Sequence, residues 1–181
     1  MVIGSFGYTI GSTSSYSTSS ANFRYGTYFV LPESGAVTNI YAYLDASATD
    51  QARAGIYRYA PGSEFIIDTD LKSISTTRQW YDFSISGGSY ILAPGSYVLS
   101  IIVEDGNVQL VNDGDFVNRT ASDPNTFPFF EGAWLNGEAD FTTDYALIIY
   151  ATYEIITGSE APSVPSSIMH YTDGLNWVVY E

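Results

Sequence analysis

The chain has 181 residues, of which 6 are basic and 20 acidic, and it contains no cysteine. Its net charge of −14 repels nucleic-acid phosphates and anionic membrane surfaces, so neither nucleic acid nor a membrane is an expected partner. Disulfides and cysteine-ligated zinc are excluded, and no apolar run approaches the roughly 18 residues that a spanning helix requires. The 16 tyrosines, with abundant serine, threonine and glycine, favour β-structure.

Short alternating runs separated by turn residues predict β-strands along most of the chain. They are expected at 2–9, 22–31, 36–44, 52–59, 64–68, 77–84, 97–104, 107–112 and 143–153. The stretches 11–20 and 113–140 are expected to be loops. About ten short strands without a helical period predict an all-β fold, an antiparallel β-sandwich of jelly-roll type.

Two consecutive strands, 36–44 and 52–59, carry tyrosines on one face. In the first, the expected inner set is Ala36, Thr38, Ile40, Ala42 and Leu44, and the outer set is Val37, Asn39, Tyr41 and Tyr43. In the second, Tyr57 and Tyr59 fall on the outer face. If the two strands are neighbours, the four tyrosines form one aromatic patch, which suits a binding or assembly surface.

Three later strands differ in how many apolar faces they present. Residues 97–104 and 143–153 are apolar on both faces, which is typical of a central strand covered on both sides or of a strand at an interface. In 77–84, Tyr81 and Phe83 are expected to point inward, whereas Trp80 points outward. The sequence therefore predicts that parts of the sheet exterior are also covered.

The composition divides the chain into a body and a C-terminal arm. Residues 1–156 form the expected β-sandwich domain, and 157–167 (TGSEAPSVPSS) have the composition of a linker. Residues 168–181 contain two apolar runs around an Asp-Gly turn, which predicts a β-hairpin arm. Because an isolated short hairpin is marginally stable in water, the arm is expected to lie on the body, on a neighbouring subunit, or in tandem with a similar element.

The sequence offers no catalytic constellation, so we expect a protein that is not an enzyme. The one histidine, His170, lies in the expected arm, and histidine-dependent catalytic or metal sites would need partners in the body. Acid–base pairs remain open because Glu131, Glu138 and Asp140 lie in one aromatic-rich loop. Nothing in their spacing directs two of them to a common point, and solvated loop acids are the simpler interpretation.

Two binding sites remain as hypotheses. Hard oxygen ligands cluster in the turns around 104–118, which fits a structural calcium site and fits ordinary turn sequences as well; the candidate ligands are Asp105, Asn107, Asp113 and Asp115. No other cofactor is expected. Trp80 and Trp134 could form a platform on which a sugar ring stacks, with burial in the core or an interface as the alternative.

The order of several short blocks resembles a known β-sandwich module. The blocks are FGYTIGSTSS, NFRYGTYFVLPESGAVTNIYAYL, ARAGIYR, WYDFSI, LAPGSYVLSIIV and TDYALIIYATYE. Modules of this kind, often with a jelly-roll core, occur in phage tail-fibre, baseplate and minor virion proteins and in bacterial or archaeal surface proteins. The resemblance implies a non-catalytic structural or adhesive role, with the protein in a virion or at the cell surface or outside the cell.

Two hypotheses follow for the function. The first is a structural subunit of a virion (tail fibre, baseplate or capsid decoration) or of an extracellular filament, which forms homo-oligomers or binds other structural subunits. The arm would add a strand to a neighbouring sheet. In this structural subunit, the expected assembly-interface residues of the body and the arm are Tyr41, Tyr43, Tyr57, Tyr59, Ile168, His170, Trp177 and Val179. The second is a carbohydrate-binding module for adhesion or receptor binding, with a glycan as the partner.

Overall fold

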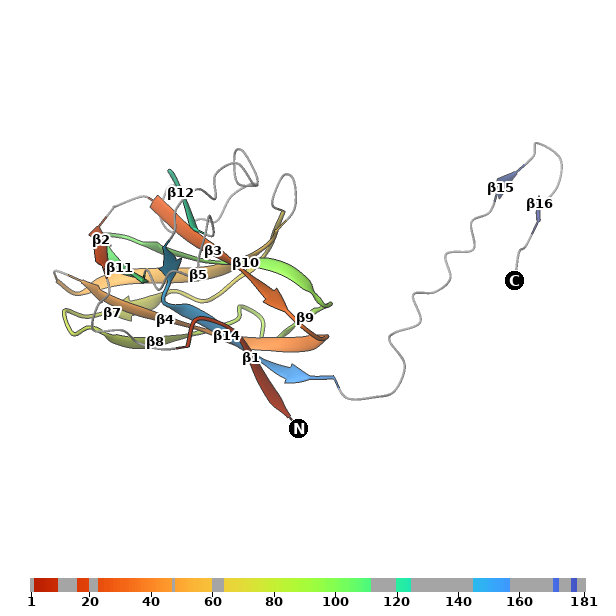
Figure 1. Cartoon of the computed structure of the whole chain (residues 1–181), viewed down its shortest axis with the longest axis horizontal. Helices are drawn as coiled ribbons and strands as arrows, with labels where there is room; N and C mark the ends of the chain where they lie inside the picture. Colours follow the sequence, from red (N-terminus) through yellow and green to blue (C-terminus); the bar gives the residue numbers. More distant parts are fainter. Residues whose placement is uncertain are drawn as a thin grey trace.

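The computed structural model describes residues 2–9, 16–19, 23–46, 48–59, 64–111, 120–124, 145–156, 171–172 and 177–178. These residues form two antiparallel sheets packed face to face, so the predicted β-sandwich is confirmed (Figure 1). Sheet A contains β1 (Ile3–Gly7), β2 (Tyr16–Ser19), β4 (Gly35–Ala46), β8 (Gln79–Ser84), β9 (Tyr90–Leu92), β11 (Gly106–Val111), β13 (Ala146–Leu147) and β14 (Ile149–Ile155). Sheet B contains β3 (Phe23–Leu31), β5 (Asp50–Arg58), β6 (Phe65–Asp68), β7 (Lys72–Ile74), β10 (Gly95–Val103) and β12 (Thr120–Pro124).

Strand β4 organises sheet A because it pairs along both of its edges. On one edge it meets β14 and β11, and on the other β8 and β9. Beyond β14 lies β1, which closes the row β1–β14–β4. In sheet B, β10 holds the same central position between β3 and β5.

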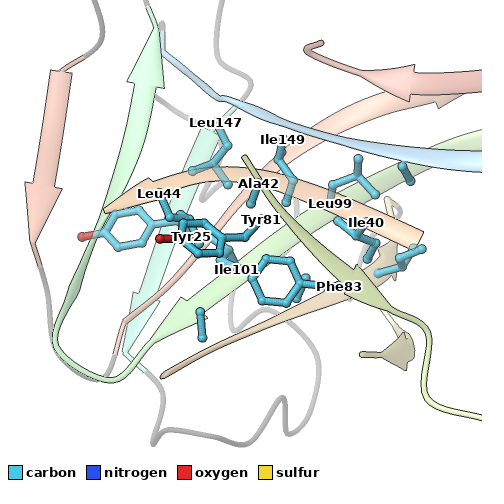
Figure 2. Packing of buried hydrophobic residues seen from close by; sticks show 14 of the residues in the cluster. Tyr25, Ile40, Ala42, Leu44, Tyr81, Phe83, Leu99, Ile101, Leu147 and Ile149 are labelled. Atoms are coloured by element: carbon cyan, nitrogen blue, oxygen red, sulfur yellow. The ribbon is translucent and has the colours of Figure 1, made fainter. Parts of the chain in front are cut away.

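The main hydrophobic core lies between the two sheets. Sheet A contributes Ile40, Ala42, Leu44, Tyr81, Phe83, Leu147 and Ile149, and sheet B contributes Tyr25, Leu99 and Ile101 (Figure 2). Alternation predicts these inward positions in β4 and β8, since every second side chain of a strand points to the same face. The inward placement of Tyr81 and Phe83, and the outward placement of Trp80, agree with the sequence prediction.

A β-bulge changes the face assignment at the start of β4. Asn39 lies opposite Thr152 and Val37 opposite Tyr153, so β4 has an extra residue, Thr38, at this point. The bulge moves Val37 into the core, where it is fully buried, and leaves Ala36 and Thr38 only half-buried. The prediction that Ala36 and Thr38 point inward and Val37 outward was therefore wrong, because the two-residue period holds only while the register is unbroken.

Strand β10 is buried on both faces, as its apolar sequence predicts. Leu99 and Ile101 belong to the main core, whereas Val98 and Ile102 pack with Tyr57 in a second cluster on the outer face of sheet B. The predicted strand 143–153 is divided into β13 and β14 around Ile148. The backbone of Ile148 bonds to both β11 and β4, so the chain passes here from one neighbouring strand to the next.

Some strands lie in stretches without an alternating pattern. Strands β2 and β12 fall within the expected loops 11–20 and 113–140, and β7 and β9 were also missed. The sequences YSTS and TASDP contain few apolar residues, so no inward set is visible in them. These strands form because β11 and β3 offer a free edge to them.

Gly7 gives a direct test of how β1 is attached to β14. Its φ is +118°, and a Cβ there would lie 2.5 Å from the carbonyl oxygen of Ile149 and 2.5 Å from the Cα of Tyr150. We expect Gly7→Ala to lower the free energy of unfolding by about 1–3 kcal/mol and to speed hydrogen exchange of the β14 amides. The matched control is Gly87→Ala, which also has positive φ but no atom within 4 Å of the added Cβ. Equal losses in chemical denaturation would contradict the steric part of the argument.

Candidate functional site

Among the described residues, four aromatic rings on the outer face of sheet A contact one another, and we call them the outer aromatic cluster: Tyr41, Tyr43, Trp80 and Tyr150. Their positions follow from register, because Tyr41 lies opposite Tyr150 on β14 and Tyr43 lies opposite Trp80 on β8. All four are half-buried. Beside them, Val111, Ala146 and Ile148 form a buried group against which Tyr43 and Trp80 pack.

The rings of the outer aromatic cluster pack mainly on one another. Tyr41 and Tyr150 stack with centroids 4.8 Å apart and an interplanar angle of 8°. Trp80 meets Tyr150 edge-on at 5.1 Å and Tyr43 at 5.3 Å. Such pairs stabilise each other by about 0.5–1.5 kcal/mol beyond their buried area. The sheet therefore presents a preformed, amphipathic surface and not a set of mobile side chains.

Polar residues border the outer aromatic cluster. Asp82 lies opposite Tyr41 on β8, and its carboxylate pairs with Lys72. The next row holds Asn39, which lies between Ser84 and Thr152. The arrangement is an apolar centre with a hydrophilic rim, which is the usual anatomy of a protein interface.

Burial of tyrosines predicts alkaline sensitivity. Burial raises the pKa of Tyr97, Tyr150 and Tyr153 above the usual 10, and the neighbouring Tyr41 adds to the effect at Tyr150. The unfolded chain ionises first, so this stabilisation is complete below pH 10 and is lost as the pH rises through the folded-state pKa values. We expect the urea midpoint of the wild type to fall between about pH 9 and pH 11. The midpoint of Tyr153→Phe should fall less steeply over this range than the midpoint of Tyr90→Phe, which removes the hydroxyl of an exposed tyrosine. Parallel pH profiles in the two variants would contradict this assignment.

Tyr57 does not join the outer aromatic cluster. Strand β5 belongs to sheet B, between β10 and β6, whereas β4 belongs to sheet A. The predicted single patch of Tyr41, Tyr43, Tyr57 and Tyr59 is therefore wrong. Consecutive strands joined by a short turn need not pair, since a sandwich also forms by crossing from one sheet to the other.

Tyr57 is buried and makes a polar contact with the buried side chain of Arg24. Tyr57 is 0% exposed, and its hydroxyl accepts a hydrogen bond of 2.8 Å from Nη1 of Arg24, whose guanidinium carbon lies 5.2 Å from the ring centroid. Tyr59 is half-buried and stacks on Tyr28 with centroids 4.4 Å apart. Tyr57 therefore stabilises the outer face of sheet B and is not accessible as an interface residue. Arg24 has no signal in the sequence beyond its place in a strand.

The C-terminal arm is described at two short strands. β15 (Tyr171–Thr172) pairs antiparallel with β16 (Trp177–Val178), Thr172 lying opposite Trp177. This pairing is the one a hairpin in 168–181 predicts. Ile168, His170 and Val179 lie outside the described residues, as does the linker 157–167, and the location of the arm stays a prediction.

Only two of the four predicted calcium ligands, Asp105 and Asn107, are among the described residues. Asp113 and Asp115 lie outside them. The side-chain Nδ2 of Asn107 donates a 3.0 Å hydrogen bond to the carboxylate of Asp45. The backbone N–H of Asp105 donates a 2.7 Å hydrogen bond to the carboxylate of Asp50. Among the described residues, no three His, Cys, Asp or Glu side chains gather as a metal site would require. The calcium site stays an untested prediction.

Asp45 is a polar hub that the sequence did not indicate. Its carboxylate accepts bonds from Nε of Arg78 at 2.7 Å, from Asn107, and from Nε2 of Gln109 at 3.4 Å. Asp45 is only 9% exposed. The carboxylate therefore joins β4 to β11 and to the residue that precedes β8.

A cleft of about 270 Å³ opens between strand β9 of sheet A and strands β5 and β6 of sheet B. It is lined by Arg58, Glu64, Phe65, Ile66, Tyr90, Ile91, Leu92, Ala93 and Tyr97. The hydroxyl of Tyr97 donates to the Ala93 carbonyl at 2.7 Å, so this phenol is already engaged. One arginine and one glutamate among apolar side chains do not define a particular ligand.

The proposed sugar platform is also described only in part. Trp80 is present in the outer aromatic cluster, whereas Trp134 lies outside the described residues.

No family model matches the chain, and no curated protein matches it. In the described part of the chain, no helix is long and apolar enough to cross a membrane.

Proposed function

We propose that this protein is a non-catalytic structural subunit that assembles through the outer face of sheet A, with itself or with other structural subunits. The setting we propose is a virion appendage, a capsid decoration or an extracellular filament. The observation that carries the proposal is the outer aromatic cluster. Its four rings are half-buried, packed on one another and bordered on one side by polar residues.

The energetics of interfaces support this role. Tyrosine and tryptophan are enriched at the centres of protein contacts because they bury a large area with few rotatable bonds. The rings of Tyr41 and Tyr150 already restrict each other, so little side-chain entropy remains to be lost when a partner covers them.

The test is the oligomeric state of the full chain, measured by light scattering over a range of concentrations. We expect the wild type to assemble. The double variant Tyr41→Ser with Trp80→Ser should need at least about a tenfold higher protein concentration to assemble, which is equivalent to about 1.4 kcal/mol. The control is Tyr90→Ser, which removes an exposed tyrosine from β9. Circular dichroism confirms that the variants are folded. A monomer at all concentrations, or equal behaviour of the two variants, would refute self-assembly through this face and leave other structural subunits as its partners.

A glycan is the second candidate partner, and one observation favours it. Trp80 and Tyr41 lie next to Asp82, Asn39 and Ser84, whose polar groups could bond sugar hydroxyls. Against it, Tyr41 and Tyr150 each use one ring face for the other, which leaves less free area for a pyranose ring. A glycan array with wild type and Trp80→Ala tests this candidate. Binding that depends on Trp80 supports it, and absence of binding at all densities rejects it.

A further inference from the structure

Among the described strands, β1 is an edge strand that pairs only with β14. The N–H of Ile155 donates to the carbonyl of Val2, and the N–H of Tyr8 donates to the carbonyl of Ile149. These two bonds set the phase of the antiparallel ladder, in which alternate residues bond to the partner strand. The backbone groups of Ile3, Ser5 and Gly7 therefore point away from β14, and no described strand pairs with them.

The β1 edge lacks the features that usually block strand addition. Proteins protect exposed edges with charged residues, prolines or very short strands. Residues 2–9 contain no charged residue and no proline, and Val2 and Ile3 are 54% and 66% exposed. Edge strands β6, β7, β8 and β12 each contain a charged residue, whereas β2, β9 and β13 are short, with four, three and two residues.

The β1 edge is also continuous with the outer aromatic cluster. Gly7 lies opposite Tyr150, which lies opposite Tyr41, so one row of paired residues runs from the cluster to the edge. Gly7 has no side chain to cover Tyr150. An aromatic residue on an added strand can pack across such a glycine.

We propose that the C-terminal arm of a second copy adds a strand to the β1 edge, through the apolar strand that contains Trp177 and Val178. This inference rests on the proposed function and names its partner and contact. Backbone bonds to Ile3, Ser5 and Gly7 would give affinity, and an aromatic contact with Tyr150 across Gly7 would set the register.

The length and exit point of the linker favour a second copy over self-docking. Ile156, which ends the described body, directly follows Ile155, whose N–H donates to the carbonyl of Val2 at the start of β1. Folding back onto the same β1 would need a connection of only a few residues. Fourteen residues separate Ile156 from Tyr171, among them Pro162 and Pro165, and they span up to about 50 Å when extended. Proline favours extended linker conformations, so this segment suits a bridge between subunits.

Cysteine cross-linking tests the contact in the full-length protein, because the chain has no native cysteine. A Ser5→Cys protein is mixed with an Asn176→Cys protein and treated with a short bismaleimide, so that an adduct between the two variants is intermolecular. We expect the Ser5–Asn176 adduct by mass spectrometry. It should be lost when Ile3→Pro is added to the Ser5→Cys chain, because proline at the first residue of an edge strand removes only the outward N–H. The matched control replaces Ser5→Cys by Ile91→Cys, an exposed position on β9.

The outcomes separate this inference from the proposed function. No adduct, equal adducts at positions 5 and 91, or insensitivity to Ile3→Pro would overturn it. So would an intramolecular adduct in a chain carrying both Ser5→Cys and Asn176→Cys at high dilution, since this would show self-docking. If the wild type still assembles and Tyr41→Ser with Trp80→Ser weakens that assembly, the proposed function stands without the arm contact. A monomeric wild type without an adduct refutes both the arm contact and self-assembly through sheet A.

Discussion

Replacing Phe83 with alanine is expected to lower the free energy of unfolding by about 3–5 kcal/mol, the usual cost of removing a buried phenylalanine. Phe83 is 1% exposed and lies opposite Ile40 on β4. It belongs to the same core cluster as Leu99 and Ile101 of sheet B (Figure 2). Because neighbouring side chains relax only partly into the space, the loss includes a cavity term as well as the lost burial of the ring.

Chemical denaturation measures this effect, with Val30→Ala as the control. Val30 is 62% exposed on β3, so its truncation should change the unfolding free energy by less than about 0.5 kcal/mol. A loss at Phe83 no larger than the loss at Val30 would mean that the two sheets do not pack as described.

Asp45→Ala is expected to cost about 2–3 kcal/mol, since it removes an acceptor that is charged and buried. The carboxylate bonds to Arg78, Asn107 and Gln109, and Gln109 is 1% exposed. The part of the loss due to Arg78 is limited, because this side chain is 39% exposed and water replaces the carboxylate there. Asp45→Asn should cost less, because an amide oxygen can still accept from one donor.

The matched control is Asp82→Ala in sheet A, which removes the partner of Lys72 in an exposed ion pair between β8 of sheet A and β7 of sheet B. Pairs of this kind contribute little to stability, because solvent screens the charges and both side chains lose conformational entropy. Urea denaturation of the three variants decides the point. If Asp45→Ala and Asp82→Ala have the same small effect, the polar hub has no special role.

Much of the candidate site could be predicted from local pattern. The outward positions of Tyr41, Tyr43 and Trp80 follow from alternation within their own strands. Tyr150 was the missing member, and its strand gave no signal because 143–153 is apolar on both faces. Its place beside Tyr41 depends on the register between β14 and β4, which a single sequence does not encode locally.

The pairing of strands could not be predicted in the same way. The single tyrosine patch required 36–44 and 52–59 to be neighbours, and alternation within each strand does not decide whether they pair. Strand β5 instead pairs with β10, which buries Tyr57 beneath Arg24 and removes it from the accessible surface. Pairing is decided by contacts between residues far apart in the chain, such as Tyr57 and Val98.

The sequence by itself determined the all-β class, the negative charge and the inward residues of unbroken strands. These are local properties, since side-chain direction in a strand repeats every two residues regardless of what lies beside it. The tertiary structure alone decided which strands became neighbours, where Thr38 shifts the register of β4 and which edge is left unpaired among the described strands. Each of these depends on many weak contacts between distant segments, and their sum selects one arrangement only when the whole chain is packed.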